Sequence, residues 1–310
     1  MPPQAPMQFY RERFALSSTV TLGAIMGTFI PYIMYFTPVP LAVMVVRHGL
    51  RSGISTAFFT SLLVGVATQT PLSMLMVLLI LGLGVVFGEA LRNGFTLRQT
   101  LMVGWLAMMV AQMMPYYVAP NLMGKDIMGE ILTYWEENLH KAVWWMDDQT
   151  IDPEKTAMLL QQIRIIFPAM IALSAAALTL ANYWFTGRWL KRLGVNVPAI
   201  PPFSHWRFPW YFAWVYIIGV ALTLLPGNLM SPLLRVAANL QVIAGVIFFV
   251  QGLALAWFFF NKLRIRRFFK VALIALGLIL ITYLFQPLVL LGLLDTWFDF
   301  RRLKYTRPPA

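Results

Sequence analysis

The sequence predicts an all-α, polytopic integral membrane protein with about eight or nine transmembrane helices. Hydrophobic residues make up 59% of the 310-residue chain and charged residues only 12%, whereas a soluble domain carries about 25% charged residues. Several apolar runs also reach the roughly 20 residues that a helix needs to cross a hydrocarbon core of about 30 Å. These two observations exclude a soluble fold.

Apolar runs and the residues between them give the expected helices in order. They fall near 14–36, 38–50, 53–68, 72–92, 97–118, 155–187, 209–225, 231–260 and 268–293. The first run has no small-residue cleavage site, so we expect it to remain as a helix. The predicted domains are an N-terminal bundle (1–187), a basic, proline-rich loop (188–208), C-terminal transmembrane helices (209–294) and a basic tail (295–310).

The stretch 37-TPVPLAVMVVRHGLRSG-53 contains an apolar run that is too short to cross a bilayer. Residues 38–46 would span about 14 Å as a helix. The ends of such a helix must be covered by protein or face a water-filled cavity. Two interpretations are open. Arg47 and Arg51 anchor the helix at the headgroups, or the helix lines a ligand cavity into which Arg47 or His48 points.

Charge distribution predicts the orientation in the membrane. Eight of the twelve acidic residues lie between Ala119 and Leu160, and basic groups fall at alternate ends of the predicted helices. A cytoplasmic N-terminus would place five basic groups inside, as the positive-inside rule requires. They are Arg11 and Arg13, Arg47 and Arg51, Arg92 and Arg98, Arg188 to Arg192, and the cluster 262–270. The net charge of +12 therefore does not indicate a nucleic-acid partner. The basic tail 301–307 would fall outside under this orientation, against the positive-inside rule. Either Pro287 breaks the last helix so that it does not fully cross, or another short run does not span the membrane.

The acidic segment 119–154 is expected to be an extracytoplasmic amphipathic helix, because its apolar residues recur at three and four positions. Asp152 and Pro153 then start a new helix that runs on to Phe185. Trp135, Trp144 and Trp145 would lie near the outer interface. The segment is either an interfacial lid or spacer, or an element that gates a ligand or binds a partner.

Small residues at four-residue spacing form a stripe on the first helix, where another backbone could approach closely. The stripe consists of Ala15, Thr19, Gly23 and Gly27. It serves either packing within the chain or docking of a partner membrane subunit. The amides of Gln112, Asn182, Asn239, Gln241 and Gln251 are expected to join helices, with ligand contact as the alternative.

Glu89 is the only acidic residue within the first five predicted helices. It is expected to pair with Arg92 at three-residue spacing; coupling to a proton or cation is the alternative. The chain has no cysteine, and its three histidines show no metal-binding spacing. No nucleophile elbow, carboxylate dyad or phosphate-binding glycine loop occurs. We therefore expect no enzyme activity, no metal and no cofactor.

Four segments resemble the YybS-like family of uncharacterised bacterial membrane proteins. They are PVPLAVMVVRHGLRSG (38–53), PPFSHWRFPWYFAW (201–214), VQGLALAWFF (250–259) and GLLDTWFDFRR (292–302). That family is distantly similar to the S components of energy-coupling factor transporters and to the cell-shape protein MreD. The resemblance implies the bacterial cytoplasmic membrane. It also implies an S-component-like N-terminal bundle, in which a solute binds in an outward-facing cavity and helix 1 docks a coupling subunit.

These observations predict a transport-related membrane protein that binds a small solute and has no ATPase of its own. The candidate cavity or gating residues are Arg47, His48, Glu89, Trp135, Trp144 and Trp145. The alternative is a non-transporting scaffold in envelope, shape or division machinery. Expected partners are the lipid bilayer and a membrane coupling subunit or envelope protein. The sequence does not identify the small-molecule ligand.

Overall fold

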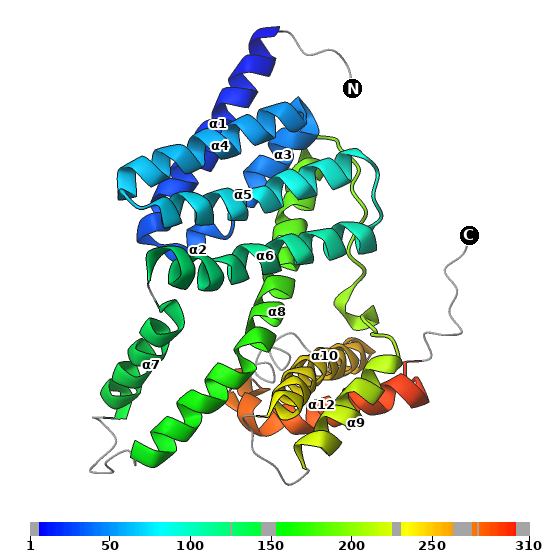
Figure 1. Ribbon diagram of the computed structural model, residues 1–310. Helices are drawn as coiled ribbons and strands as arrows, with labels where there is room; N and C mark the ends of the chain where they lie inside the picture. The colour runs from blue at the N-terminus through cyan, green and yellow to red at the C-terminus, as the bar shows by residue number, and fades with distance from the viewer. Residues whose placement is uncertain are drawn as a thin grey trace. The chain divides into compact units, whose positions relative to one another are not determined.

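The computed structural model describes residues 6–124, 126–143, 153–224, 231–262, 275–277 and 279–301, and within these ranges it contains helices and no strand. The helices are α1 (Pro6–Phe29), α2 (Pro31–Met34), α3 (Pro38–His48), α4 (Leu50–Thr68), α5 (Pro71–Arg92), α6 (Leu97–Met123), α7 (Ile127–Val143), α8 (Pro153–Arg192), the 3₁₀ helix η1 (Phe203–His205), α9 (Tyr211–Thr223), α10 (Pro232–Lys262) and α12 (Ile281–Phe298) (Figure 1). The predicted all-α class is confirmed.

Within the described residues, six helices are long and apolar enough to span a membrane: α4, α5, α6, α8, α10 and α12. They correspond to six of the nine predicted crossings. The other three correspond to α1, α3 and α9. α3 has 11 residues and α9 has 13, too few for a span. Large apolar side chains point outward from α4, as expected for a surface in lipid; they include Phe58, Phe59, Leu62, Leu63 and Val66. The chain is therefore a multi-pass membrane protein.

The chain forms two compact units. Unit 1 comprises Met1–Thr156 and Ile171–Ile200, and unit 2 comprises Ala157–Met170 and Pro201–Ala310. The boundary at residue 200 falls within the predicted loop 188–208. Residues 157–170, which the sequence assigns to the N-terminal bundle, group with the C-terminal helices instead.

The first predicted helix, 14–36, differs from the structure at both ends. α1 begins at Pro6 and ends at Phe29. Apolar runs miss its first turns because these contain Arg11, Glu12 and Arg13. The helix ends before Pro31 because a proline forces the preceding residue out of the helical region, and Ile30 has φ −125° and ψ 89°. The chain then turns through α2 into α3.

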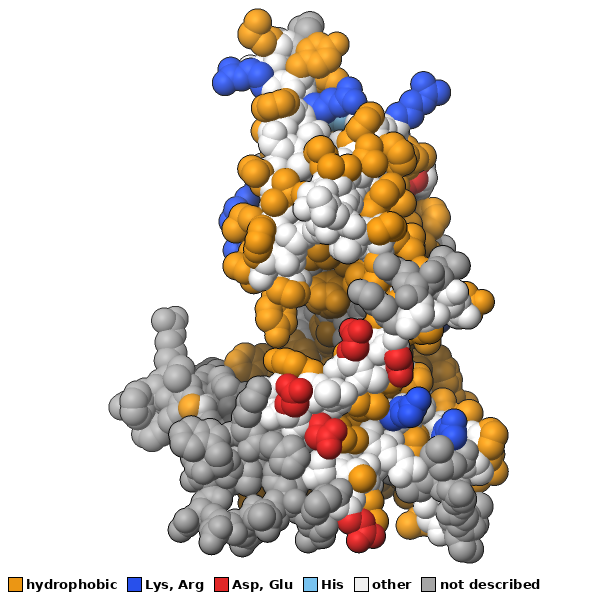
Figure 2. Space-filling view, turned by 60° about the vertical axis from the view of Figure 1, so that its left-hand side comes forward, with side chains coloured by type: hydrophobic (Ala, Val, Ile, Leu, Met, Phe, Trp, Pro, Cys, Tyr) orange, Lys and Arg blue, Asp and Glu red, His pale blue; other side chains and the backbone are white. Residues whose placement is uncertain are grey.

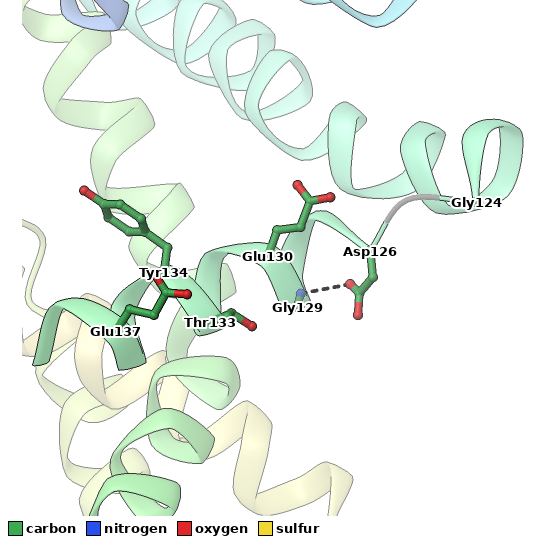
Figure 3. Close-up of a pocket in the computed structure, with 7 residues that line it drawn as sticks. All are labelled: Gly124, Asp126, Gly129, Glu130, Thr133, Tyr134 and Glu137. Atoms are coloured by element: carbon green, nitrogen blue, oxygen red, sulfur yellow. Dashed lines mark hydrogen bonds between the residues drawn. The ribbon is translucent and has the colours of Figure 1, made fainter. Parts of the chain in front are cut away.

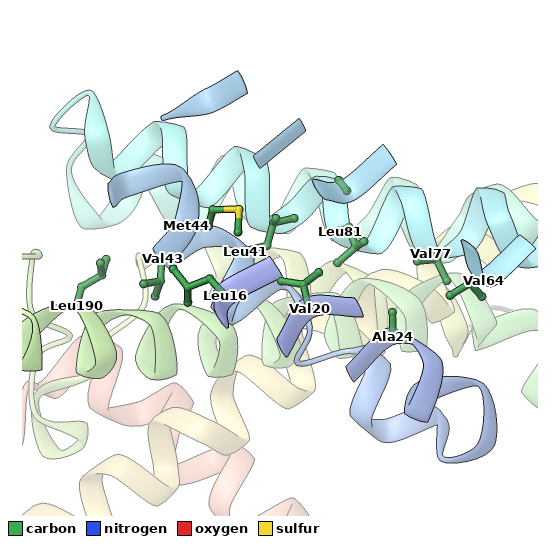
Figure 4. Packing of buried hydrophobic residues seen from close by; sticks show 11 residues of the cluster. Leu16, Val20, Ala24, Leu41, Val43, Met44, Val64, Val77, Leu81 and Leu190 are labelled. Carbon is green, nitrogen blue, oxygen red and sulfur yellow. The ribbon is translucent and has the colours of Figure 1, made fainter. Parts of the chain in front are cut away.

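The short helix α3 lies in the core of unit 1. Its residues from Pro38 to Val45 are all buried, and it contacts α1, α4 and α5. Val43 and Met44 pack in one cluster with Leu16 and Val20 of α1 (Figure 4). Other helices therefore cover α3, which is too short to span the membrane. Its backbone ends at membrane depth are shielded from lipid by protein, as they must be.

Two glycines of α5 allow α3 to approach this closely. A Cβ atom at Gly84 would lie 2.6 Å from the backbone oxygen of Pro38, and one at Gly88 would lie 2.8 Å from that of Ala42. We expect Gly84→Ala to lower the free energy of unfolding by about 1–3 kcal/mol, because backbone has to move. Gly82→Ala on the same helix is a matched control, since nothing lies within 4 Å of its Cβ position, and it should be neutral or stabilising by up to about 1 kcal/mol. Denaturant titration in detergent measures both; equal effects would contradict this packing.

Hydroxyl groups join α1 to α4. Ser17 pairs with Thr56 at 3.2 Å, and Thr21 pairs with Thr60 at 2.9 Å. Both contacts link residues 39 apart, so the two helices run in parallel. The start of α1, the α3–α4 junction and the end of α5 therefore lie at one end of unit 1. We call this the basic end, because Arg11, Arg13, Arg47, Arg51 and Arg92 belong to it.

In unit 2, the side chain of Asn239 on α10 forms hydrogen bonds with backbone groups of α8 beside Pro168. A proline inside a helix lacks an N–H group and displaces the carbonyl of the preceding turn. Asn239 accepts from the Ala169 amide at 2.8 Å and donates to the Ile165 carbonyl at 2.7 Å. The predicted role of this amide in joining helices is thereby confirmed.

The last helix lies further along the chain than predicted. α12 spans Ile281–Phe298 and contains Pro287, so the proline does not break it there. It packs against α10 (Figure 1). Cβ atoms at Gly252 and Gly292 would overlap the backbone oxygens of Leu288 and Phe248, which shows how close these two helices approach.

Candidate functional site

The predicted residues Arg47 and His48 face protein at the basic end of unit 1. Arg47 donates from Nε to Glu12 Oε1 at 2.9 Å and from Nη2 to Oε2 at 2.7 Å. This fork is the strong, bidentate geometry of an arginine–carboxylate pair. His48 lies against Phe9, with ring centroids 4.6 Å apart. Glu12 is the partner that sequence reasoning missed, because no local pattern connects residues 35 apart.

Glu89 lies near Arg92, at the three-residue spacing on which the predicted pair depends. Its Oε2 lies 3.9 Å from Arg92 Nη1, and its Oε1 accepts from Asn93 at 3.1 Å. Among the described residues, no group of three or more His, Cys, Asp or Glu side chains could hold a metal ion.

The small-residue stripe of α1 divides into two halves. Ala15 and Thr19 are exposed. Gly23 and Gly27 serve internal packing, since their Cβ positions lie 3.1 Å from the Thr37 methyl group and 2.7 Å from Met34 Cβ. Only the first half is available to a partner.

The amphipathic helix α7 exposes its acidic side chains (Figure 2). An open hollow on it is lined by Gly124, Asp126, Gly129, Glu130, Thr133, Tyr134 and Glu137 (Figure 3). Asp126 accepts from the Gly129 amide at 3.0 Å, which fixes the start of the helix. Trp135 is 47% exposed. Trp144 and Trp145 lie outside the described residues.

A row of polar side chains on α8 is buried inside unit 1, and each of them has an atom without a hydrogen-bond partner. We call Thr179, Asn182 and Thr186 the α8 polar row; their residues are at most 2% exposed. Thr179 Oγ1, Asn182 Oδ1 and Thr186 Oγ1 are buried and have no hydrogen-bond partner. Of these three residues the sequence singles out only Asn182, as an amide expected to join helices, while Thr179 and Thr186 are weak polar interruptions of an apolar run.

Neighbouring groups extend the α8 polar row toward other helices. Asn182 donates from Nδ2 to the Tyr35 carbonyl at 2.9 Å, which places it beside the start of α3. Ser174, two turns earlier on α8, donates to Gln112 Oε1 of α6 at 2.7 Å, and Gln112 Nε2 is also buried without a partner. These groups are neutral. They could bind hydroxyl or amide groups but no ion by direct charge pairing.

Unit 2 contains a buried charge cluster formed by Arg207, Gln251, Asp295, Asp299 and Arg301. Arg301 donates to Asp295 Oδ2 at 2.7 Å, and both side chains are 0% exposed. Arg207 donates to Asp299 Oδ1, also at 2.7 Å.

Gln251 ties the charge cluster to backbone, accepting from the Phe208 amide at 3.0 Å and donating to the Gly292 carbonyl at 3.0 Å. Arg301 also donates to the carbonyls of Ser204 and Trp206 at 2.7 and 3.0 Å. The cluster thus joins the segment after residue 200 to the middle of α10, at Gln251, and to the C-terminal end of α12.

Comparison with known proteins assigns the chain to a family. The family model described as "Predicted membrane protein (DUF2232)" matches residues 17–296. The chain belongs to this family. It is also 23% identical over 300 residues to "Uncharacterized protein YybS" of Bacillus subtilis (strain 168), covering 93% of this chain and 94% of that protein. No solved structure matches.

The match to the DUF2232 family covers both the α8 polar row and most of the charge cluster. Three of the four segments that carry the YybS resemblance (201–214, 250–259 and 292–302) meet at the charge cluster, since each supplies at least one of its residues. The fourth segment forms α3 and the junction to α4. The four segments therefore coincide with buried contacts that lie within one unit or the other: α3 in unit 1 and the charge cluster in unit 2.

Proposed function

We propose that this protein binds a small, neutral, hydrogen-bonding solute at the α8 polar row and takes part in its transport across the membrane. The observation that carries the proposal is the row of buried, unpartnered atoms on Thr179, Asn182 and Thr186. Buried polar atoms nearly always have partners, and in a membrane protein water is scarce. A solute with hydroxyl or amide groups would supply the missing partners.

The resemblance to S components supports the same use, because those proteins bind a solute and depend on a separate coupling subunit for energy. The sequence contains no phosphate-binding glycine loop, so we infer that any ATPase is a different chain. The α8 polar row adjoins the start of α3 through the bond from Asn182 to the Tyr35 carbonyl, whereas the cavity predicted from the sequence involves Arg47 and His48 at the other end of that helix.

Replacing an unpartnered hydroxyl tests the proposal. Thr179→Val and Thr186→Val keep the side-chain shape and break no hydrogen bond of the two hydroxyl groups, so the stability of the protein without solute should be unchanged. Each variant should weaken solute binding about 3- to 10-fold, the equivalent of one neutral hydrogen bond. The measurement is thermal stabilisation by a panel of polar metabolites, including those that co-purify from native membranes.

Thr21→Val is the matched control, because the Thr21 hydroxyl already pairs with Thr60. It should lower stability and leave solute affinity unchanged. If no metabolite stabilises the unaltered protein, or if the three variants bind equally well, the α8 polar row is not a solute site.

The exposed acidic surface of α7 favours a second candidate function, a membrane scaffold that holds a basic envelope protein. Asp126, Glu130 and Glu137 face the hollow in Figure 3, and complementary charge steers such contacts. The same purified samples separate the two functions. A scaffold would retain a protein partner that Glu130→Lys and Glu137→Lys release, whereas the two valine variants would have no effect on that partner.

A further inference from the structure

A buried histidine at the basic end of unit 1 lies beside a carboxylate that it does not bind. The His48 side chain is 1% exposed, and its Nε2 atom is 4.0 Å from Glu12 Oε2, beyond hydrogen-bond distance. Neither ring nitrogen has a hydrogen-bond partner. A covered imidazole with two nitrogens that make no hydrogen bond is uncommon, and a neutral imidazole has one nitrogen that can accept a proton.

The nearby carboxylate already has a partner on the same oxygen. Arg47 Nη2 donates to Glu12 Oε2 at 2.7 Å. An imidazolium at position 48 would therefore compete with Arg47 for this oxygen. Phe9 covers the imidazole edge-on, with an interplanar angle of 69°. Phe9 and Glu12 both belong to the first turns of α1, so one short helical segment makes both of these contacts with His48.

We propose that His48 is a proton-binding site whose charging draws Glu12 away from Arg47 and shifts the first turns of α1 against the α3–α4 junction. A proton from solvent adds to a neutral ring nitrogen, and the new N–H group donates to Glu12 Oε2. No covalent bond between heavy atoms changes. The site is independent of the α8 polar row and stands whether or not a solute binds there.

The surrounding charges define the resting state. Arg13 on α1 and Arg47 on α3 disfavour an added positive charge on His48. Two further arginines belong to the neighbouring helices. Arg51, in the first turn of α4, is exposed, and Arg92 Nη1 of α5 lies 3.4 Å from the Cβ position of Gly49. Burial lowers the pKa of His48 below its ordinary value of 6.5, while Glu12 opposes this shift. The stabilisation from neutral His48 is thus complete above pH 6.5 and is lost as the pH falls through the lowered pKa.

Histidine NMR of the intact protein in nanodiscs tests the site. The chain has three histidines, and His48→Gln identifies the resonance of His48. We expect that resonance to titrate below pH 6.5 in the unaltered protein. Glu12→Gln should lower its midpoint further, because the carboxylate that favours the charged ring is gone. Phe9→Leu should raise the midpoint, because water then reaches the ring.

The two variants shift the midpoint in opposite directions, which a general loss of structure would not do. The resonance of His205, in unit 2, is the internal control and should not move in either variant. The proposal is overturned if His48 titrates at or above pH 6.5, does not titrate between pH 4 and pH 8, or is insensitive to Glu12→Gln.

Discussion

Arg301→Met should lower the free energy of unfolding by about 3–5 kcal/mol, because it leaves Asp295 as a buried charge without its counter-ion. The two side chains are 0% exposed and 2.7 Å apart. The change also removes the donors to the carbonyls of Ser204 and Trp206. Denaturant titration in detergent micelles measures the effect.

A second variant separates the charge from the packing. Arg301→Met combined with Asp295→Leu should recover part of the lost stability, since no uncompensated charge remains. Arg98→Met is the control, because Arg98 is exposed on α6 and its loss should change stability by less than about 0.5 kcal/mol. An Arg301→Met protein as stable as this control would show that the charge cluster does not hold unit 2 together.

Asn239→Leu is expected to have the second large effect, a loss of about 2–6 kcal/mol. The reason is that two backbone groups of α8, the Ala169 amide and the Ile165 carbonyl, lose the partner that compensates for Pro168. Each unsatisfied buried group costs about 1–3 kcal/mol, and lipid offers no substitute.

Pro168→Ala in the Asn239→Leu background tests the cause. An unbroken α8 would pair its own backbone groups, so this second change should restore much of the stability. Asn121→Ala is the matched control, since the amide of this exposed residue donates to the Tyr117 carbonyl of its own helix. If the double variant is no more stable than Asn239→Leu alone, Asn239 does not act through the proline.

Long apolar runs made much of the fold predictable. The predicted bounds of α5 and α10 are within two residues of those observed, because their apolar residues are continuous and prolines mark their starts. The first turns of α1 were missed because they are charged. The predicted last helix, 268–293, contains Pro287, as α12 does, but it ends five residues before Phe298, because Asp295 and Asp299 interrupt the apolar pattern there.

The site residues were less predictable, because their roles depend on contacts between distant parts of the chain. The pair of Glu12 with Arg47 and that of Arg207 with Asp299 join residues 35 and 92 apart. Asn182 was expected to join helices, and its Nδ2 bonds α8 to the turn between α2 and α3, but only the structure shows that its Oδ1 has no partner. Local spacing found the contact between Glu89 and Arg92 because both lie on one helical turn.

The most direct test of the proposed function is an experimental structure of the protein extracted with its native lipids. We predict non-protein density within about 3 Å of Asn182 Oδ1 and of the hydroxyl of Thr179 or Thr186, with the size of a small polar solute. Protein side chains or a lipid acyl chain filling this position, with all three atoms still unpartnered, would contradict solute binding at the α8 polar row.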